Sequence, residues 1–458
     1  MYFDPQAYTV KELTLKGTTI RYRAFTDIPY VDNPLVPDYQ KLAIYVPEAY
    51  YHGESLNGYN LETAPVFVPN AVGGYMPGEM AEPGYNLFAP PGTINSLFWA
   101  IDHGYVVVSP ALRGRTLCDE AGNWTGKAPA RLVDYKAAIR YLHAFSDVLP
   151  GDQNKIITNG TSAGGALSSL IATTIDHPDY EPYLTEIGAA QTTDRVLAAS
   201  CYCPITNLEH ADMAYEWQFN SVHAYTRTNI VIGAGGRPDF IPEDGDLTAS
   251  QLNLSDQLKA AFPAYLNSLE LTDGNGRALQ LDVDGHGSYA DHLGDILRQS
   301  AEQAGIPLER IGWLTTETFD LAGFAADITR MKTPPAFDAL SCDSGENDLF
   351  GDRQHQFKHF TSFTKEQATS DQPLADPQIV KLMNPMHYIA DEQAGKAAHI
   401  RIRHGQRDRD TSLAISAILS LMLEKYGHSV DYQAPWGVEH DGDYDLDQLF
   451  AWIDSICQ

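Results

Sequence analysis

Basic residues are scarce in this chain. Its 458 residues include 31 Lys and Arg against 60 Asp and Glu, which gives a formal net charge of −29 at pH 7. Nucleic acids and anionic membrane surfaces repel a protein of this charge, because both are strongly negative themselves. We therefore expect no nucleic acid and no membrane as partners, and a small molecule as the ligand. Composition implies no particular oligomeric state.

Cysteines and long apolar runs are also few. Five cysteines are scattered along the chain, and this odd, dispersed set excludes a disulfide framework, so we expect free thiols. No run reaches the roughly 18 apolar residues of a membrane span. The first residues, Met1 to Pro5, lack the basic and apolar segments of a signal peptide. These observations predict a cytoplasmic protein.

What the chain does contain is a regular alternation of two patterns. Short β-branched runs alternate with amphipathic stretches, a pattern typical of a mostly parallel sheet covered by helices on both faces. The predicted strands are 65–69, 105–109, 156–157 and 196–202, and the predicted helices are 96–101 and 131–145. Two earlier strands, 18–23 and 42–46, are expected before this alternation begins, the first as an antiparallel edge. The fold class is therefore α/β.

The alternation stops near residue 204 and resumes at 398. Strands are predicted at 398–403 and 429–433, and helices at 412–426 and 446–456. Between the two parts lie about 190 residues with amphipathic helices at 255–266 and 288–303, far more than an ordinary loop holds. We expect a core of residues 1–203 and 396–458 that is split by a folded lid of residues 204–395.

The stretch Gly160-Thr161-Ser162-Ala163-Gly164 spells G-x-S-x-G between a predicted strand and a predicted helix. In this context the motif places a serine on a sharp turn above a sheet, and the glycines are needed where strand and helix approach closely. Ser162 is thus the candidate nucleophile of an α/β-hydrolase.

The partners of such a serine follow in the chain order acid, then histidine. Asp408 comes soon after the strand at 398–403, and His440 follows the last strand. His440 would act as the general base and Asp408 would orient its imidazole. His404 and Asp410 are the nearest competitors for these two roles.

A negatively charged oxygen that develops during ester hydrolysis needs hydrogen-bond donors. The amide of Ala163, directly after the nucleophile, is one candidate. The other lies in the glycine-bearing loop that follows the strand at 65–69, where Gly73, Gly74 and Tyr75 all qualify. We select Gly74. No cluster of His and Asp residues has metal-ligand spacing, and the segment 282–287, which resembles an ion-binding loop, is more typical of a polar turn, so no metal is expected.

Several segments together resemble bacterial tannases, the tannin acyl hydrolases that cleave galloyl esters, and the resemblance extends over the whole chain. They are Gly160 to Gly165, Lys332 to Glu346, His404 to Asp410 and Glu439-His440. The resemblance implies an α/β-hydrolase core, a large lid, no cofactor and a gallate pocket formed by three polar side chains. These fall on Lys332, Glu346 and Asp410, which leaves Asp408 as the acid of the triad.

The chemistry of the implied ligand agrees with this set. A galloyl group carries three adjacent phenolic hydroxyls, to which carboxylates can accept and an ammonium can donate hydrogen bonds. Two other classes of protein remain as alternatives. The first is another serine hydrolase with the same triad, such as a feruloyl esterase, carboxylesterase or peptidase, and the second is an esterase fold that has lost catalysis and retains only binding. The presence of all three triad residues disfavours the second.

Overall fold

The computed structural model of the chain describes residues 1–86, 89–232 and 238–457. Within them, nine strands form one sheet in the order β1-β2-β3-β5-β4-β6-β7-β10-β11. In chain order they span Thr9–Leu15 (β1), Thr18–Pro29 (β2), Lys41–Pro47 (β3), Pro65–Pro69 (β4), Val106–Pro110 (β5), Asp152–Thr161 (β6), Ala198–Tyr202 (β7), His399–Arg403 (β10) and Ser429–Gln433 (β11). β4, β5 and β7 are buried along their whole length, as their continuous apolar sequences require.

The sheet is antiparallel at one end and parallel over the rest. β1, β2, β3 and β5 pair antiparallel in succession, whereas every neighbouring pair from β5 to β11 is parallel. The α/β prediction is thereby confirmed. The expected antiparallel edge, however, is not the strand at 18–23 but β1, whose alternating polar pattern was overlooked.

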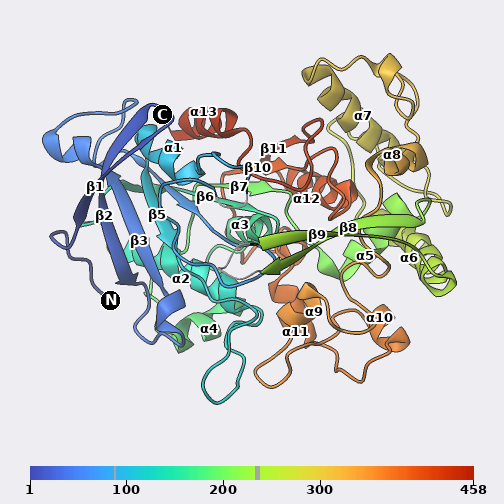
Figure 1. Ribbon diagram of the computed structural model, residues 1–458, viewed down its shortest axis with the longest axis horizontal. Coiled ribbons are helices and arrows are strands. Elements are labelled where there is room, and N and C mark those ends of the chain that lie inside the picture. Colours follow the sequence, from blue (N-terminus) through green and yellow to red (C-terminus); the bar gives the residue numbers. More distant parts are fainter. Residues whose placement is uncertain (87–88, 233–237, 458) are drawn as a thin grey trace.

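Helices cover both sides of this sheet. Figure 1 shows α1 (Ser96–Asp102) and α13 (Leu446–Cys457) on one side, and α2 (Ala130–Ala144) and α4 (Glu181–Glu186) on the other. α3 (Ala163–Thr173) packs against β6, β7 and α2, and α12 (Leu413–Lys425) packs against β11. Short 3₁₀ turns occur at Pro37–Tyr39, Glu48–His52, Pro178–Tyr180, Leu308–Arg310 and Pro385–His387.

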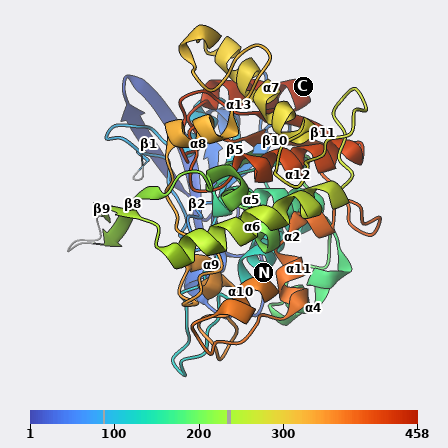
Figure 2. The ribbon, with the colours of Figure 1, turned by 90° about the vertical axis from the view of Figure 1, so that its right-hand side faces the viewer.

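None of the described elements between β7 and β10 joins the nine-stranded sheet. They occupy the right-hand half of Figure 1 and face the viewer in Figure 2. The helices are α5 (Leu208–Phe219), α6 (Ala249–Ser268), α7 (Ser288–Gln303), α8 (Leu321–Ile328), α9 (Gly345–Leu349), α10 (Ser362–Gln367) and α11 (Pro377–Leu382). A separate antiparallel ribbon of β8 (Ala224–Ile232) and β9 (Pro238–Asp246) had not been predicted.

The register of the parallel strands brings their carboxyl ends into one row. Thr161 of β6 pairs with Tyr202 of β7, Tyr202 pairs with Arg403 of β10, and Arg403 pairs with Gln433 of β11. The residues that follow these four positions therefore emerge at one edge of the sheet, which is where open α/β sheets place their ligands.

Two further expectations concern the whole chain. All five cysteines are unpaired in the structure, as predicted. No helix among the described residues combines the length and the apolarity that crossing a membrane requires.

Candidate active site

Ser162 is the single residue between β6 and α3. Its φ of 61° and ψ of −120° are strained for a residue with a side chain. A Cβ at Gly160 would overlap the carbonyl oxygen of Gly164, and a Cβ at Gly164 would overlap the side chain of Asn70. The strand, sharp turn and helix expected from G-x-S-x-G are thus present, with glycines where the backbone leaves no other choice.

A continuous chain of hydrogen bonds runs from this serine. The Nε2 atom of His440 lies 2.8 Å from Oγ of Ser162, and its Nδ1 atom lies 2.8 Å from Oδ2 of Asp408. The buried carboxylate of Asp408 also accepts a hydrogen bond from the Asp410 amide at 2.8 Å. With the Nδ1 proton directed at the carboxylate, Nε2 is free to accept the serine hydroxyl proton.

The two competitors lie nearby but make different contacts. His404 is fully buried, its Nε2 is 3.8 Å from Asp408, and neither ring nitrogen has a hydrogen-bond partner among the described residues. The side chain of Asp410 points to Lys332 instead, with Oδ1 3.0 Å from Nζ. The histidine in contact with Ser162 is therefore His440, and the carboxylate in contact with that histidine belongs to Asp408.

The electrostatics of the pair favour proton acceptance by His440. Burial by itself would raise the pKa of Asp408, but His440 and His404 lower it to about 2. Burial also lowers the pKa of His440, yet the carboxylates of Asp408 and Asp410 and the sulfur of Cys203 outweigh this and raise it well above its ordinary value. The carboxylate thus stays ionised and stabilises a charged imidazolium.

Two backbone segments could donate hydrogen bonds to an oxyanion. Ala163 is the first residue of α3, where amides and the helix dipole favour negative charge. The second segment is a tight turn after β4 in which the Met76 amide donates to the Gly73 carbonyl at 2.9 Å. Gly74 and Tyr75 in its centre have φ of 52° and 57°.

This turn is attached to the nucleophile elbow at two points. Asn70 donates from Nδ2 to the Gly164 carbonyl at 3.1 Å. The Tyr75 hydroxyl donates to the Ile205 carbonyl at 3.2 Å, and the Ile205 amide in turn donates to the Ser162 carbonyl at 3.3 Å. The glycine-bearing turn and the serine are therefore parts of one rigid arrangement.

The three residues assigned to the ring hydroxyls also interact with one another. Lys332 pairs with Asp410 and lies 4.0 Å over the ring of Phe337. Burial lowers the pKa of Lys332, but Asp410 and Glu346 outweigh it and raise the value. Burial raises the pKa of Glu346, and Lys332 partly opposes this. One cation and two carboxylates thus form a half-buried polar set beside the serine, histidine and aspartate.

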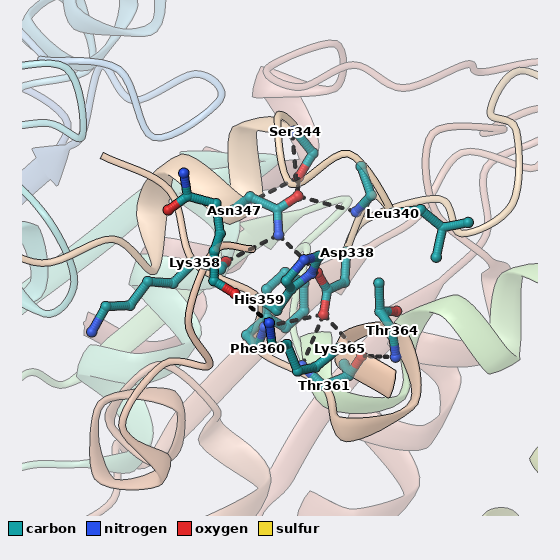
Figure 3. A network of polar contacts seen from close by, with 12 residues as sticks. Asp338, Leu340, Ser344, Asn347, Lys358, His359, Phe360, Thr361, Thr364 and Lys365 are labelled. Carbon is teal, nitrogen blue, oxygen red and sulfur yellow. Dashed lines mark hydrogen bonds and ion pairs between the residues drawn. The ribbon is translucent and has the colours of Figure 1, made fainter. Parts of the chain in front are cut away.

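The helix that carries Glu346 is held firmly. Ser344 caps α9 and accepts a hydrogen bond from the Asn347 amide at 3.0 Å. The Asn347 side chain donates at 2.7 Å to the buried Asp338, which stands in the centre of the network in Figure 3. A five-residue helix has little stability of its own, so these contacts fix the position of Glu346.

Two further residues lie at the site although the sequence patterns did not predict them there. Cys203 follows β7, and its Sγ lies 3.9 Å from Nε2 of His440. Asp443 accepts a hydrogen bond from Asn159 at 2.9 Å. The signal that could have found Cys203 is its place at the carboxyl end of a strand in the same row as Ser162.

Among the described residues, Cys203, Asp408 and His440 are the one group of potential metal ligands whose atoms lie within 4.8 Å of one another. Asp408 is hydrogen-bonded to Nδ1 of His440, and Ser162 is hydrogen-bonded to Nε2. Both ring nitrogens of His440 are thus occupied by hydrogen bonds to the other two members of the Ser162, His440 and Asp408 array, which leaves neither free to bind an ion.

Comparisons with known proteins agree with this geometry. Residues 90–241 match the family model BD-FAE. Over 69 residues, 15% of this chain and 17% of its own length, esterase LipC from Mycobacterium tuberculosis is 39% identical. A tannase from Fusobacterium nucleatum is 46% identical, covers 100% of this chain and 99% of its own, and superposes with a TM-score of 0.94.

Other solved structures give the same result. A tannase from Lactobacillus plantarum is 44% identical with a TM-score of 0.95, and the match covers 100% of this chain and 98% of that one. A tannin acyl hydrolase in complex with ethyl gallate is 43% identical with a TM-score of 0.92, over the same shares of the two chains. Identity at this level over the full length shows that the chain belongs to the tannase family of esterases, with the α/β-hydrolase fold.

Proposed function

We propose that this chain hydrolyses galloyl esters, depsides among them, through a covalent acyl-enzyme on Ser162. The observation that supports the proposal is a direct contact between the Ser162, His440 and Asp408 array and the polar set of Lys332, Glu346 and Asp410. Asp410, whose carboxylate pairs with Lys332, is two residues from Asp408, whose carboxylate orients His440. The Asp410 amide also donates a hydrogen bond to Asp408. A galloyl ring held by Lys332 would thereby have its ester group close to Ser162.

In the first half of the reaction, His440 removes the hydroxyl proton while Oγ of Ser162 attacks the ester carbonyl carbon. The carbonyl oxygen becomes negatively charged, and the amides of Ala163 and Gly74 stabilise it. His440 then gives its proton to the leaving alcohol, and the ester bond breaks. The galloyl group is left bonded to Ser162.

In the second half, a water molecule replaces the alcohol. His440 takes a proton from the water, which attacks the acyl carbon, and the second tetrahedral species collapses with return of the proton to Ser162. Gallic acid is released. Asp408 keeps the imidazole in the required tautomer in both halves.

Recognition of the ring rests on Lys332, Glu346 and Asp410. The two carboxylates accept hydrogen bonds from ring hydroxyls and the ammonium donates one. An unsubstituted ring would displace water from these half-buried groups without replacing its hydrogen bonds, and only the Lys332–Asp410 pair would remain. Such a site can discriminate by about 10⁴- to 10⁵-fold against an analogue without the hydroxyls.

The division of labour follows the chain. Residues 1–203 and 396–458 form the catalytic core, and residues 204–395 form a lid that supplies Lys332 and Glu346. The position of the described elements of this segment outside the nine-stranded sheet supports the division. Five unpaired cysteines support a reducing compartment, the cytoplasm.

The test compares kcat/KM for methyl gallate, methyl benzoate, methyl ferulate and nitrophenyl acetate. We expect methyl gallate to exceed methyl benzoate by about 10⁴-fold. Lys332→Ala and Glu346→Ala should each reduce this ratio while nitrophenyl acetate is hydrolysed as before. Equal losses on every ester would contradict the assignment of these two residues, and a preference for methyl ferulate would make the chain a feruloyl esterase.

A further inference from the structure

One arginine outside the sites described so far contacts both the glycine-bearing turn and the helix of Glu346. Arg115 lies in the segment between β5 and α2. Its backbone amide donates to the Tyr75 carbonyl at 3.0 Å, and its Nε donates to the Gly74 carbonyl at 2.8 Å. Its Nη1 forms an ion pair with Asp348, two residues beyond Glu346 on α9.

The hydrogen bond to Gly74 fixes more than one oxygen. The peptide between Gly74 and Tyr75 is not among the cis bonds of the described chain, so the Gly74 carbonyl and the Tyr75 amide point in opposite directions. By holding the carbonyl, Arg115 fixes the Gly74–Tyr75 peptide and with it the backbone conformation of Gly74, the residue whose own amide is the proposed oxyanion donor. The left-handed φ of 57° at Tyr75 is uncommon for a residue with a side chain and needs such support.

The contact with α9 is equally direct. Asp348 is almost fully buried, and its carboxylate requires positive partners. The guanidinium of Arg115 lies against the start of the helix, since a Cβ at Gly345 would be 3.4 Å from its Nη2. Its charge also lowers the pKa of Glu346, against the larger effect of burial.

We propose that Arg115 is a positioning residue that ties the oxyanion turn at Gly74 and Tyr75 to the acyl-binding helix α9. The guanidinium holds the turn in the orientation that oxyanion binding needs, and the buried carboxylate of Asp348 holds the guanidinium. The proposal rests on the proposed function for the role of the turn and of Glu346. It adds a side chain that touches neither substrate nor nucleophile, yet sets the rate of the chemical step.

The chain offers a matched control in Lys127. Its ammonium pairs with the other oxygen of Asp348 and lies 4.4 Å over the ring of Trp124, and no hydrogen bond within the described part of the chain joins it to the turn. Removal of Lys127 takes one positive charge from the same buried carboxylate. Only the removal of Arg115 also releases Gly74.

The experiment measures kcat, KM and melting temperature for Arg115→Met, Arg115→Lys and Lys127→Met with methyl gallate and with nitrophenyl acetate. Loss of an oxyanion donor lowers kcat by about 10²- to 10³-fold, and we expect Arg115→Met to approach the lower figure on both esters. The KM for nitrophenyl acetate should change little. Arg115→Lys keeps a positive charge beside Asp348 and replaces Arg115→Met in the test if that variant does not fold. It should still lower kcat by about tenfold, because an ammonium lacks the forked geometry for both contacts.

Lys127→Met should lower the melting temperature about as much as Arg115→Met does, because both remove one positive charge from Asp348. Its kcat should stay within about threefold of wild type. Equal kcat losses in the Arg115 and Lys127 variants would overturn the proposal, as would Arg115 variants that differ from wild type only in melting temperature or KM. The nitrophenyl acetate measurements separate this outcome from failure of the proposed function. A chain without preference for methyl gallate would disprove galloyl recognition, whereas the turn is still tested by turnover of the small ester.

Discussion

The molecule contains a second Ser, His and Asp array with almost the same distances as the active site. In the segment between β7 and β10, Oγ of Ser370 lies 3.0 Å from Nε2 of His359, and Nδ1 of His359 lies 2.8 Å from Oδ1 of Asp338. The corresponding active-site distances are both 2.8 Å. Hydrogen-bond lengths alone therefore do not distinguish the two arrays.

The surroundings of the two arrays differ. Asp338 accepts hydrogen bonds from the Asn347 side chain, the hydroxyl and amide of Thr361 and the Phe360 amide besides that of the imidazole, as Figure 3 shows. His359 is fully buried, whereas the His440 side chain is 23% exposed. Ser370 lies outside every helix and strand, with no glycine elbow and no helix start beside it.

A catalytic triad therefore needs more than three residues joined by hydrogen bonds. Each aspartate accepts hydrogen bonds from two backbone amides, so the difference lies in the additional side-chain donors to Asp338, the Asn347 amide and the Thr361 hydroxyl. The fully buried imidazole of His359 has no access to a substrate. The active-site array is instead partly open and stands at the edge where four parallel strands end. We assign a structural role to the Asp338 array, and the following predictions test that contrast.

The largest effect is expected from paired replacement of the two serines. Ser162→Ala should reduce ester hydrolysis by about 10⁶-fold without unfolding the protein, because the covalent route is lost. Ser370→Ala should leave kcat within about twofold of wild type, since this hydroxyl contacts no reacting atom. Turnover of nitrophenyl acetate measures both, and circular dichroism verifies that both variants fold.

Substantial activity in Ser162→Ala would end the serine mechanism. A large loss in Ser370→Ala, with an intact fold and an unchanged melting temperature, would show that the second array participates in the reaction and that the contrast drawn above is wrong.

The two aspartates should separate rate from stability. Asp408→Asn should lower kcat by about 10⁴-fold, because the amide favours the wrong imidazole tautomer, with little change in KM. Asp338→Asn should cost about 2–4 kcal/mol of stability instead, because buried donors lose their acceptor, and turnover of nitrophenyl acetate should persist below the melting temperature. Urea denaturation and steady-state kinetics at one temperature give both quantities.

The reverse pattern, with Asp338→Asn inactive but stable, would exchange the roles of the two arrays. Asp410→Asn provides a further distinction, because its loss should fall mainly on galloyl substrates. Were nitrophenyl acetate turnover lost in Asp410→Asn and retained in Asp408→Asn, the triad acid would be Asp410.

The pH dependence offers a third test. Catalysis requires His440 in its neutral form, and neighbouring negative groups raise the pKa of His440 well above its ordinary value. The kcat/KM for an ester should therefore fall tenfold per pH unit on the acid side of that raised pKa. In Asp408→Asn the same limb should move to lower pH, because the main charge that raises the pKa is gone. An unmoved limb would show that another group titrates.

Much of the core could be predicted from residue patterns. Buried β-branched runs such as Pro65–Pro69 have few alternatives to a central strand, and G-x-S-x-G between strand and helix locates Ser162 without further information. The acid was less certain, since Asp408 and Asp410 lie in one loop and only the direction of each side chain separates them. That direction depends on the Asp410 amide, which donates to Asp408, and on Lys332.

The segment between β7 and β10 was largely beyond such reasoning. Lys332 and Asp410 are 78 residues apart and their contact follows no periodicity, so only the resemblance to tannases pointed to it. β1 and the β8–β9 ribbon were not predicted, because polar residues are mixed with the apolar ones along most of their length. The Asp338 array could not be predicted from the sequence, because its members meet through tertiary packing alone.

The contact of Lys332 with the core depends on one hydroxyl. The buried Tyr215 of α5 donates to the Arg409 carbonyl at 2.9 Å, and it accepts from the amides of Lys332 at 2.9 Å and Met331 at 3.2 Å. One donated and two accepted bonds use the full capacity of a hydroxyl. Tyr215 thus fixes the backbone on both sides of the Lys332 and Asp410 pair, from the lid and from the core.

The smallest expected effect follows from removing that hydroxyl alone. Tyr215→Phe keeps the ring but leaves two amides and a carbonyl unpaired, so Lys332 should shift by a fraction of an ångström and kcat/KM for methyl gallate should fall about tenfold. Nitrophenyl acetate, which makes no use of Lys332, should be hydrolysed as before. Tyr289→Phe, which removes an equally buried hydroxyl bonded to the Ala414 carbonyl at 2.8 Å, is the control and should affect stability only. Equal losses on both esters, or the same loss in both tyrosine variants, would mean that Tyr215 supports the fold and does not position Lys332.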